Sequence, residues 1–200
     1  DPDIMAKAAL AIDPEAPVKV KLTGDLGDDI ARVAAIRAAR PDAWIGVDAN
    51  QGYDVGTLAD LLPVLVEARV AQLEQPLKRG READLDGLKR PLPFVADESA
   101  LSLADTASLV GRFDVVNIKL DKCGGLTEGL AIARQAKRLG LDVMVGNMMG
   151  TSLSMAPSYL VGQLCDIVDL DGPTFLARDR APGVEYRGGR IHCPAEIWSS

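Results

Sequence analysis

Short apolar runs alternate with amphipathic stretches along almost the whole chain. Seven of these runs have the length and residue types of β-strands. They cover residues 18–22, 44–47, 70–73, 94–96, 115–118, 143–145 and 167–170. Between them, apolar residues recur at helical spacing over about 28–40, 57–69, 103–111, 127–139 and 152–164, with a weaker, shorter helix near 81–90. This alternation predicts βαβ units and a parallel sheet.

The spacing of the strands favours a modified TIM barrel within the α/β class. Successive strand ends lie 22 to 28 residues apart. An unbroken repeat of this size suits an eight-unit βα barrel better than an open sheet. The open doubly wound sheet is the alternative, but residues 22–27, after the first strand, match its Gly-rich phosphate-binding turn poorly.

The two ends of the chain do not follow the repeat. The chain opens on a helix, and a barrel cannot begin with its helix and close, so we expect its first strand and whatever preceded it to be absent. Residues 184–193 have the pattern of a β-hairpin that turns at Gly188 and Gly189. We therefore expect an incomplete barrel over 1–180 and a tail over 181–200 that packs outside it.

Composition narrows the class of protein without naming a substrate. The 200 residues suffice for one domain, and the net charge of −7 argues against nucleic acid or an anionic membrane as partner. No apolar run approaches membrane-spanning length, and the first residues lack a signal-peptide pattern. The three cysteines form no CxxC pair, which favours a reducing cytoplasm over a disulfide framework or a zinc site.

Three carboxylates follow three successive strand-like runs: Asp48, Glu74 and Asp97. Any one of them could be an ordinary turn or helix-capping residue, but three in succession weaken that explanation. Active sites of βα barrels lie at the carboxyl ends of the strands, where these side chains would converge and repel one another unless a cation lay among them. Oxygen ligands favour a hard ion, and we predict Mg²⁺, with Mn²⁺ fitting almost as well.

Three lysines have a similar placement. Lys19 and Lys21 are two residues apart on a strand, so both point to the same side, and their mutual repulsion favours a neutral amine that can act as a base. The alternative is an edge strand with solvated lysines. Lys119 ends a long apolar run, whereas Lys122 lies past the strand end and is, of the two, the one more expected to be merely exposed.

Taken in order, these segments resemble the enolase superfamily, in particular its muconate-lactonizing-enzyme subgroup. The segments are Lys19-Val20-Lys21, Asp48-Ala49-Asn50, Glu74-Gln75-Pro76, Ala96-Asp97-Glu98-Ser99 and Asn117-Ile118-Lys119-Leu120. The resemblance extends from about Asp3 to the hairpin. It implies a (β/α)₇β barrel and an N-terminal capping domain that closes over the barrel mouth, and we expect that capping domain to be absent from this chain.

The resemblance also implies a role for each residue. Asp48, Glu74 and Asp97 match the three metal ligands. Lys21 matches the base on one face of the substrate, Lys19 matches its partner, and Lys119 matches the acid/base on the opposite face. Enzymes of this superfamily pair such a base with Mg²⁺: they abstract the proton α to a carboxylate, and the metal stabilises the enediolate.

The last strand narrows the substrate class. Asp169-Leu170-Asp171-Gly172-Pro173 resembles the DxD motif of dipeptide epimerases, in which two carboxylates hold the free ammonium group of the dipeptide. Two carboxylates on one side of a strand would suit a cation, although Asp171 could instead cap a turn before Gly-Pro. The segment from Val145 to Ser152 resembles the substrate-facing loop of that group, so Asn147 and Met148 are expected to contact substrate.

We therefore expect a cytoplasmic, Mg²⁺-dependent isomerase that epimerises dipeptides of the L-Ala-D/L-Glu type by two-base proton transfer. Its expected partners are the dipeptide, the capping domain and, as an open alternative, further copies of the chain. A cycloisomerase, an o-succinylbenzoate synthase or an N-acylamino-acid racemase would keep the same lysines and metal ligands. None of these needs a site for a free ammonium group. A non-catalytic barrel fragment is the alternative from a different class.

Overall fold

The computed structural model describes residues 1–198 of the chain. Two compact units make up the chain, Asp1–Val95 and a second unit that begins at Ala96. Helices alternate with parallel strands in both units, and residues 1–198 contain seven parallel strands in all. The predicted α/β class is therefore confirmed. Within the same residues, no helix has both the length and the apolar character that crossing a membrane requires.

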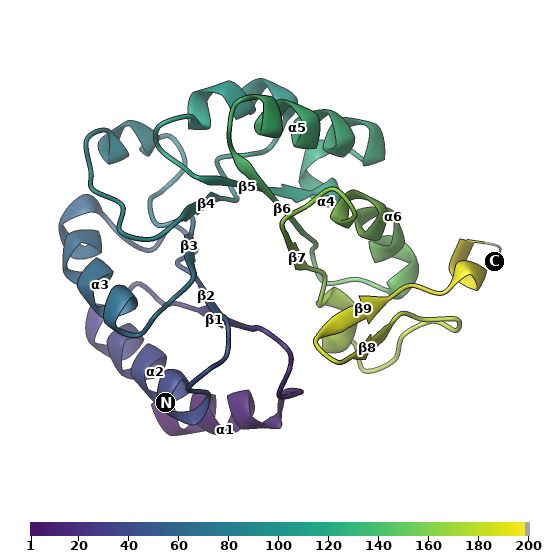
Figure 1. Ribbon diagram of the computed structural model, residues 1–200, viewed down its shortest axis with the longest axis horizontal. Helices are drawn as coiled ribbons and strands as arrows, with labels where there is room; N and C mark the ends of the chain where they lie inside the picture. The colour runs from purple at the N-terminus through teal and green to yellow at the C-terminus, as the bar shows by residue number, and fades with distance from the viewer. Residues whose placement is uncertain (199–200) are drawn as a thin grey trace. The chain divides into compact units, whose positions relative to one another are not determined.

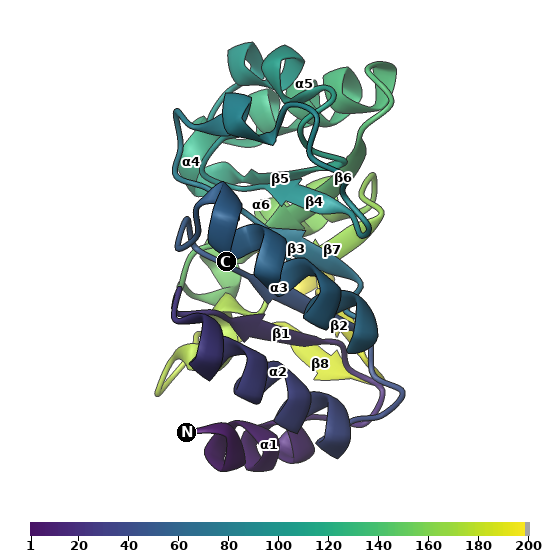
Figure 2. The ribbon, with the colours of Figure 1, turned by 90° about the vertical axis from the view of Figure 1, so that its left-hand side faces the viewer.

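The first unit places its strands in chain order, and its helices pack beside them. Its elements are α1 (Pro2–Ala11), β1 (Val18–Lys21), α2 (Leu26–Ala39), β2 (Ile45–Asp48), α3 (Val55–Glu67), β3 (Gln72–Glu74), the 3-10 helix η1 (Glu82–Leu85) and β4 (Phe94–Ala96). Each strand pairs in parallel with the next. Helix α1 packs on α2 and α2 on α3, along one side of the strands (Figures 1 and 2).

The second unit repeats this arrangement and ends in a hairpin. Its elements are η2 (Leu103–Leu109), β5 (Val115–Lys119), α4 (Leu120–Cys123), α5 (Leu126–Arg138), β6 (Asp142–Gly146), α6 (Ser152–Gly162), β7 (Ile167–Asp169), η3 (Gly172–Phe175), β8 (Glu185–Arg187), β9 (Arg190–His192) and η4 (Ala195–Trp198). Strands β5, β6 and β7 pair in parallel, whereas β8 and β9 are antiparallel (Figure 1). The hairpin turns at Gly188 and Gly189, which both have positive φ.

The burial of the strands explains their sequence patterns. Strands β2, β3 and β4 are buried at every position, as expected for parallel strands covered on both faces. Strand β1 alternates, with Val18 and Val20 buried and the two lysines between and after them more exposed. The segment predicted as a helix over 103–111 forms the tighter 3-10 helix η2, and the strand predicted over 167–170 ends at Asp169.

A buried carboxylate ties together the loops that follow β1 and β2. The Asp29 side chain is fully buried at the start of α2 and accepts hydrogen bonds from the backbone N–H groups of Thr23 and Gly24. The Tyr53 hydroxyl donates to its Oδ2 at 2.7 Å. A side chain at Gly24 would place its Cβ 2.8 Å from the Gly52 carbonyl oxygen, so the two loops touch directly. These contacts fix the backbone that leaves Lys21 and Asp48.

Replacing Tyr53 with phenylalanine should lower the stability of the first unit. Burial, and then the hydrogen bond to Asp29, raise the pKa of Tyr53, so its hydroxyl stays protonated as a donor. Losing one hydrogen bond to a buried charge costs about 2 kcal/mol of unfolding free energy. Urea unfolding followed by circular dichroism measures this loss. Tyr159→Phe is the control because its hydroxyl makes none of these contacts, and equal midpoints for both variants would contradict the prediction.

Candidate active site

The strand register of the first unit aligns three predicted site residues. Lys21 on β1 pairs with Asp48 on β2, and Asp48 pairs with Glu74 on β3. All three stand at the last position of their strands. Because the strands are parallel, these ends lie at one edge of the sheet. The first unit therefore places Asp48 and Glu74 side by side at the ends of their strands.

Both lysines of the first strand pair with these carboxylates. Lys19 Nζ lies 2.6 Å from Glu74 Oε2 and 3.7 Å from Asp48 Oδ2, and Lys21 Nζ donates to Asp48 Oδ2. The carboxylates are buried, whereas 61% of the Lys21 side chain is exposed, against 18% for Lys19. The Lys21 amine is thus held on one side by a buried carboxylate, and its other side is open to a ligand.

Just beyond these strands, several non-glycine residues have positive φ angles, which residues with a side chain rarely adopt. Asn50, Gln51 and Gln75 have φ values of 44°, 64° and 37°. Gln75 is the least expected because it precedes Pro76, and residues before proline favour extended backbone. Each such residue costs about 1–3 kcal/mol, and such strain concentrates at functional sites. The turn after β3 is held by Gln75 itself, whose backbone N–H donates to the Val95 carbonyl at 2.9 Å.

The second unit builds a matching arrangement around Asp97. This carboxylate is buried, and Lys119, at the end of β5, donates to its Oδ2 at 2.7 Å. Burial alone would raise the pKa of Asp97, but the ammonium groups of Lys122 and Lys119 outweigh burial and hold the pKa below its usual value. Asp97 is therefore a stable carboxylate, and Lys119 is only 11% exposed.

Lys122 is slightly more exposed than Lys119, as expected, but it is not merely a surface residue. Only 15% of its side chain is exposed, and its Nζ donates to Asp97 Oδ1 and to the Asp97 carbonyl oxygen. The reason is α4, a single helical turn that follows β5 directly and brings positions three apart to the same side. Two sequence features would have revealed this pairing. Lys119 and Lys122 are three residues apart, and Gly124 follows as a C-cap residue with left-handed backbone conformation.

The proposed ammonium site differs from its expected form. We expected Asp169 and Asp171 to share one strand, but β7 ends at Asp169 and Asp171 precedes the 3-10 helix η3. Its carbonyl oxygen accepts hydrogen bonds from the backbone N–H and hydroxyl of Thr174. Gly172 and Pro173 begin this turn, and they end the extended backbone one residue earlier than the hydrophobic pattern suggested.

The loop after β6 lies against the same turn. A side chain at Gly172 would place its Cβ 2.6 Å from the Met148 carbonyl oxygen, and it would also meet the Asn147 side chain. The Asn147 side-chain nitrogen and oxygen are buried and have no hydrogen-bond partner within residues 1–198. Met148 is 54% exposed. The structure thus brings the two loops that carry Asn147, Met148, Asp169 and Asp171 together.

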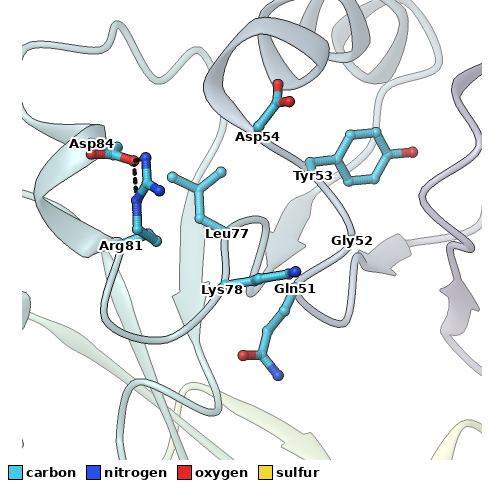
Figure 3. A pocket seen from close by; sticks show the side chains of 8 residues that line it. All are labelled: Gln51, Gly52, Tyr53, Asp54, Leu77, Lys78, Arg81 and Asp84. Carbon is cyan, nitrogen blue, oxygen red and sulfur yellow. Dashed lines mark hydrogen bonds and ion pairs between the residues drawn. The ribbon is translucent and has the colours of Figure 1, made fainter.

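A cavity of about 320 Å³ lies in the first unit, between the loops that follow β2 and β3 (Figure 3). Its walls mix polar, charged and apolar side chains, and Arg81 pairs with Asp84 on one side. The lining residues are Gln51, Gly52, Tyr53, Asp54, Leu77, Lys78, Arg81 and Asp84. None of these lining residues is a predicted site residue.

Comparison with characterised proteins points to epimerases and racemases. The chain is 41% identical to an N-acetyl-D-glutamate racemase from Pseudoalteromonas sp, across 95% of this chain and 60% of the relative. It is 42% identical to the L-Ala-D/L-Glu epimerase of Escherichia coli (strain K12), across 88% of this chain and 54% of the relative. The chain therefore spans somewhat more than half the length of these relatives.

Solved structures of similar proteins share the fold. One is an enolase family member from Agrobacterium tumefaciens with homology to dipeptide epimerases, bound to sodium and L-Ala-L-Glu; it is 42% identical, with a TM-score of 0.90 over 99% of this chain and 60% of its own. Another is a dipeptide epimerase from Methylococcus capsulatus complexed with Mg; it is 33% identical, with a TM-score of 0.86 over 94% of this chain and 59% of its own.

These similarities confirm the predicted fold class and the resemblance to the enolase superfamily. The match to the family described as enolase C-terminal domain-like covers residues 5–196 and so includes every lysine and carboxylate of the candidate site. The chain belongs to the enolase C-terminal domain-like family.

Proposed function

We propose that this chain carries the catalytic groups of a Mg²⁺-dependent dipeptide epimerase, which inverts the carbon α to the terminal carboxylate of substrates such as L-Ala-L-Glu. The observation that carries the proposal is the pairing of lysines with buried carboxylates at strand ends in both units: Lys21 with Asp48, and Lys119 with Asp97. The relatives named as dipeptide epimerases support the substrate class.

The metal assignment rests on the chemistry of the donors. Asp48, Glu74 and Asp97 are a group of buried carboxylates that could hold a metal ion. Carboxylate oxygens without Cys or His suit Mg²⁺, and each of the three is paired with an ammonium group, as expected where negative charge must be offset. When bound, the ion would supply positive charge that stabilises the enediolate formed as the α-proton leaves.

The lysines would then divide the proton transfer. Lys21, starting as a neutral amine, removes the α-proton from one face of the substrate, and Lys119, starting as an ammonium group, gives a proton to the other face, so the Cα–H bond that breaks is replaced by one of opposite configuration. The reverse reaction uses them in exchanged roles. Lys19, 2.6 Å from Glu74, contributes charge beside the carboxylates. Asp169 and Asp171 accept the free ammonium group of the dipeptide, beside Asn147 and Met148.

Proton exchange in deuterated water tests this proposal. Purified protein with Mg²⁺ is expected to exchange the glutamyl α-proton of L-Ala-L-Glu and to form L-Ala-D-Glu, both followed by NMR. Removing the metal with EDTA should stop both processes, and adding Mg²⁺ in excess should restore them. Absence of exchange with Mg²⁺ present, on every dipeptide of a varied set, would favour the non-catalytic alternative.

One relative favours a second candidate, racemisation of N-acylamino acids. The N-acetyl-D-glutamate racemase is as similar to this chain as the dipeptide epimerase is, and its named substrate has no free ammonium group. Asp169 and Asp171 argue for the dipeptide because two carboxylates suit a cation. The assay decides between them: faster exchange of N-acetylglutamate than of L-Ala-L-Glu would replace the first proposal with the second.

A further inference from the structure

The segment after η3 contacts both loops of the proposed ammonium site. Residues 179–187, which we call the clamp segment, run into β8 of the C-terminal hairpin. Asp179 accepts hydrogen bonds from the backbone N–H and the hydroxyl of Ser152, the first residue of α6. Ser152 is fully buried, and its Oγ accepts a hydrogen bond from the Val184 N–H at 2.9 Å. The clamp segment is therefore fastened to the end of the loop that begins at Asn147.

The same segment is fastened to the loop after β7 by one side chain. The Tyr186 hydroxyl donates to the Leu170 carbonyl oxygen at 2.6 Å. Leu170 is buried between Asp169 and Asp171, and its carbonyl belongs to the peptide bond that joins Leu170 to Asp171. Holding this carbonyl limits rotation of that peptide unit, and so it limits the directions in which the two carboxylates can point.

The surroundings of Tyr186 suit a permanent donor. Burial raises the pKa of its hydroxyl, and the charges of Asp171, Asp179 and Asp169 raise it further. These carboxylates are near enough to act on the phenol, yet its hydrogen bond goes to the backbone carbonyl between them. The hairpin fixes the backbone that carries Tyr186, because Tyr186 pairs with Ile191 across β8 and β9.

We propose that the clamp segment is a specificity-determining part of the site, in which Tyr186 is a positioning residue for Asp169 and Asp171. The proposal rests on the proposed function, because it assumes that these carboxylates receive the ammonium group of a dipeptide. Tyr186 acts on the carboxylates through the Leu170 carbonyl. Its loss should therefore weaken recognition of the ammonium group and leave the proton-transfer lysines unaffected.

The test compares Tyr186→Phe with Tyr159→Phe, a matched control that removes a tyrosine hydroxyl from α6. For L-Ala-L-Glu, Tyr186→Phe is expected to raise KM about fivefold to tenfold, as the loss of one buried hydrogen bond implies, with kcat within about twofold of wild type. Hydrogen–deuterium exchange should quicken at the amides of residues 169–172 in this variant alone. Tyr159→Phe should match wild type in all three measurements.

Two results would overturn the inference, and they differ from failure of the proposed function. A Tyr186→Phe variant with unchanged KM, beside a wild type that epimerises L-Ala-L-Glu, would show that Tyr186 does not position the ammonium site. So would amide exchange at residues 169–172 that is unchanged by the substitution. A wild-type protein that exchanges no α-proton from L-Ala-L-Glu would instead overturn the proposed function, and with it the substrate role of the clamp segment.

Discussion

Replacing Lys119 with alanine is expected to reduce epimerisation of L-Ala-L-Glu by orders of magnitude while leaving proton exchange on one stereoisomer intact. In the proposed two-base scheme, Lys21 alone can remove and return a proton on its own face, and the proton mixes with solvent between the two steps. Without Lys119, no group delivers a proton to the other face. General acid–base groups contribute about 10²–10⁴-fold to rates, so epimerisation should fall by about that factor.

A second lysine beside Asp97 allows the loss of activity in Lys119→Ala to be assigned to the missing acid/base group. Lys122 also pairs with Asp97, so the carboxylate keeps an ammonium partner after Lys119 is removed. The substitution therefore leaves no buried carboxylate unpaired, and the variant should remain folded. If Lys122 did not pair with Asp97, a loss of activity in Lys119→Ala could result from collapse of the site rather than from loss of the acid/base group.

NMR in deuterated water separates the two processes, because exchange removes the α-proton signal and epimerisation creates the signals of the other diastereomer. L-Ala-L-Glu and L-Ala-D-Glu are tested separately, and only one should exchange in Lys119→Ala. Lys21→Ala should show the opposite preference. Lys137→Ala is the control, because Lys137 is about half exposed and pairs only loosely, at 3.7 Å, with Asp166. Normal epimerisation by Lys119→Ala would rule out the two-base scheme.

The elements of the fold follow from short-range patterns, which explains why the sequence predicted them closely. Parallel strands that are buried on both faces appear as continuous apolar runs, as in β2 and β5. The carboxylates at strand ends were predictable for the same reason, since the end of an apolar run marks the edge of the sheet. Asp48 and Glu74 are the last residues of β2 and β3, as this argument requires.

The contacts that the sequence did not reveal are those between segments far apart in the chain. Asp29 and Tyr53 meet through two loops, and Tyr186 reaches Leu170 from a hairpin 16 residues away. The sequence spacing of neither pair identifies it as a contact, because the two residues of each pair meet only when complete helices, strands and loops pack together. The pairing of Lys122 with Asp97 is hidden for a different reason: Lys122 lies past the end of the apolar run, but the one-turn helix α4 folds the chain back.

Glu74 is the carboxylate whose replacement should most affect metal binding. It is fully buried, it ends β3 beside Asp48, and its partner Lys19 lies 2.6 Å away. Glu74→Gln keeps the shape of the side chain and removes its charge. With one anionic ligand lost and the Lys19 ammonium no longer offset, we expect the affinity for Mg²⁺ to fall by at least about 100-fold, as a difference near 2.7 kcal/mol implies.

The stability of the protein gives a readout of this binding that does not depend on turnover. A ligand that binds only the folded state stabilises it, by about 2.7 kcal/mol at a free concentration 100 times its Kd. Mg²⁺ should therefore raise the Tm of the wild type and leave that of Glu74→Gln unchanged at the same concentration, with isothermal titration calorimetry giving the two Kd values. Glu67→Gln, an exposed change at the end of α3, serves as the control. Equal Mg²⁺ affinity in wild type and Glu74→Gln would remove Glu74 from the metal site, because a neutral amide cannot replace a carboxylate ligand beside an unpaired ammonium group without a loss of affinity.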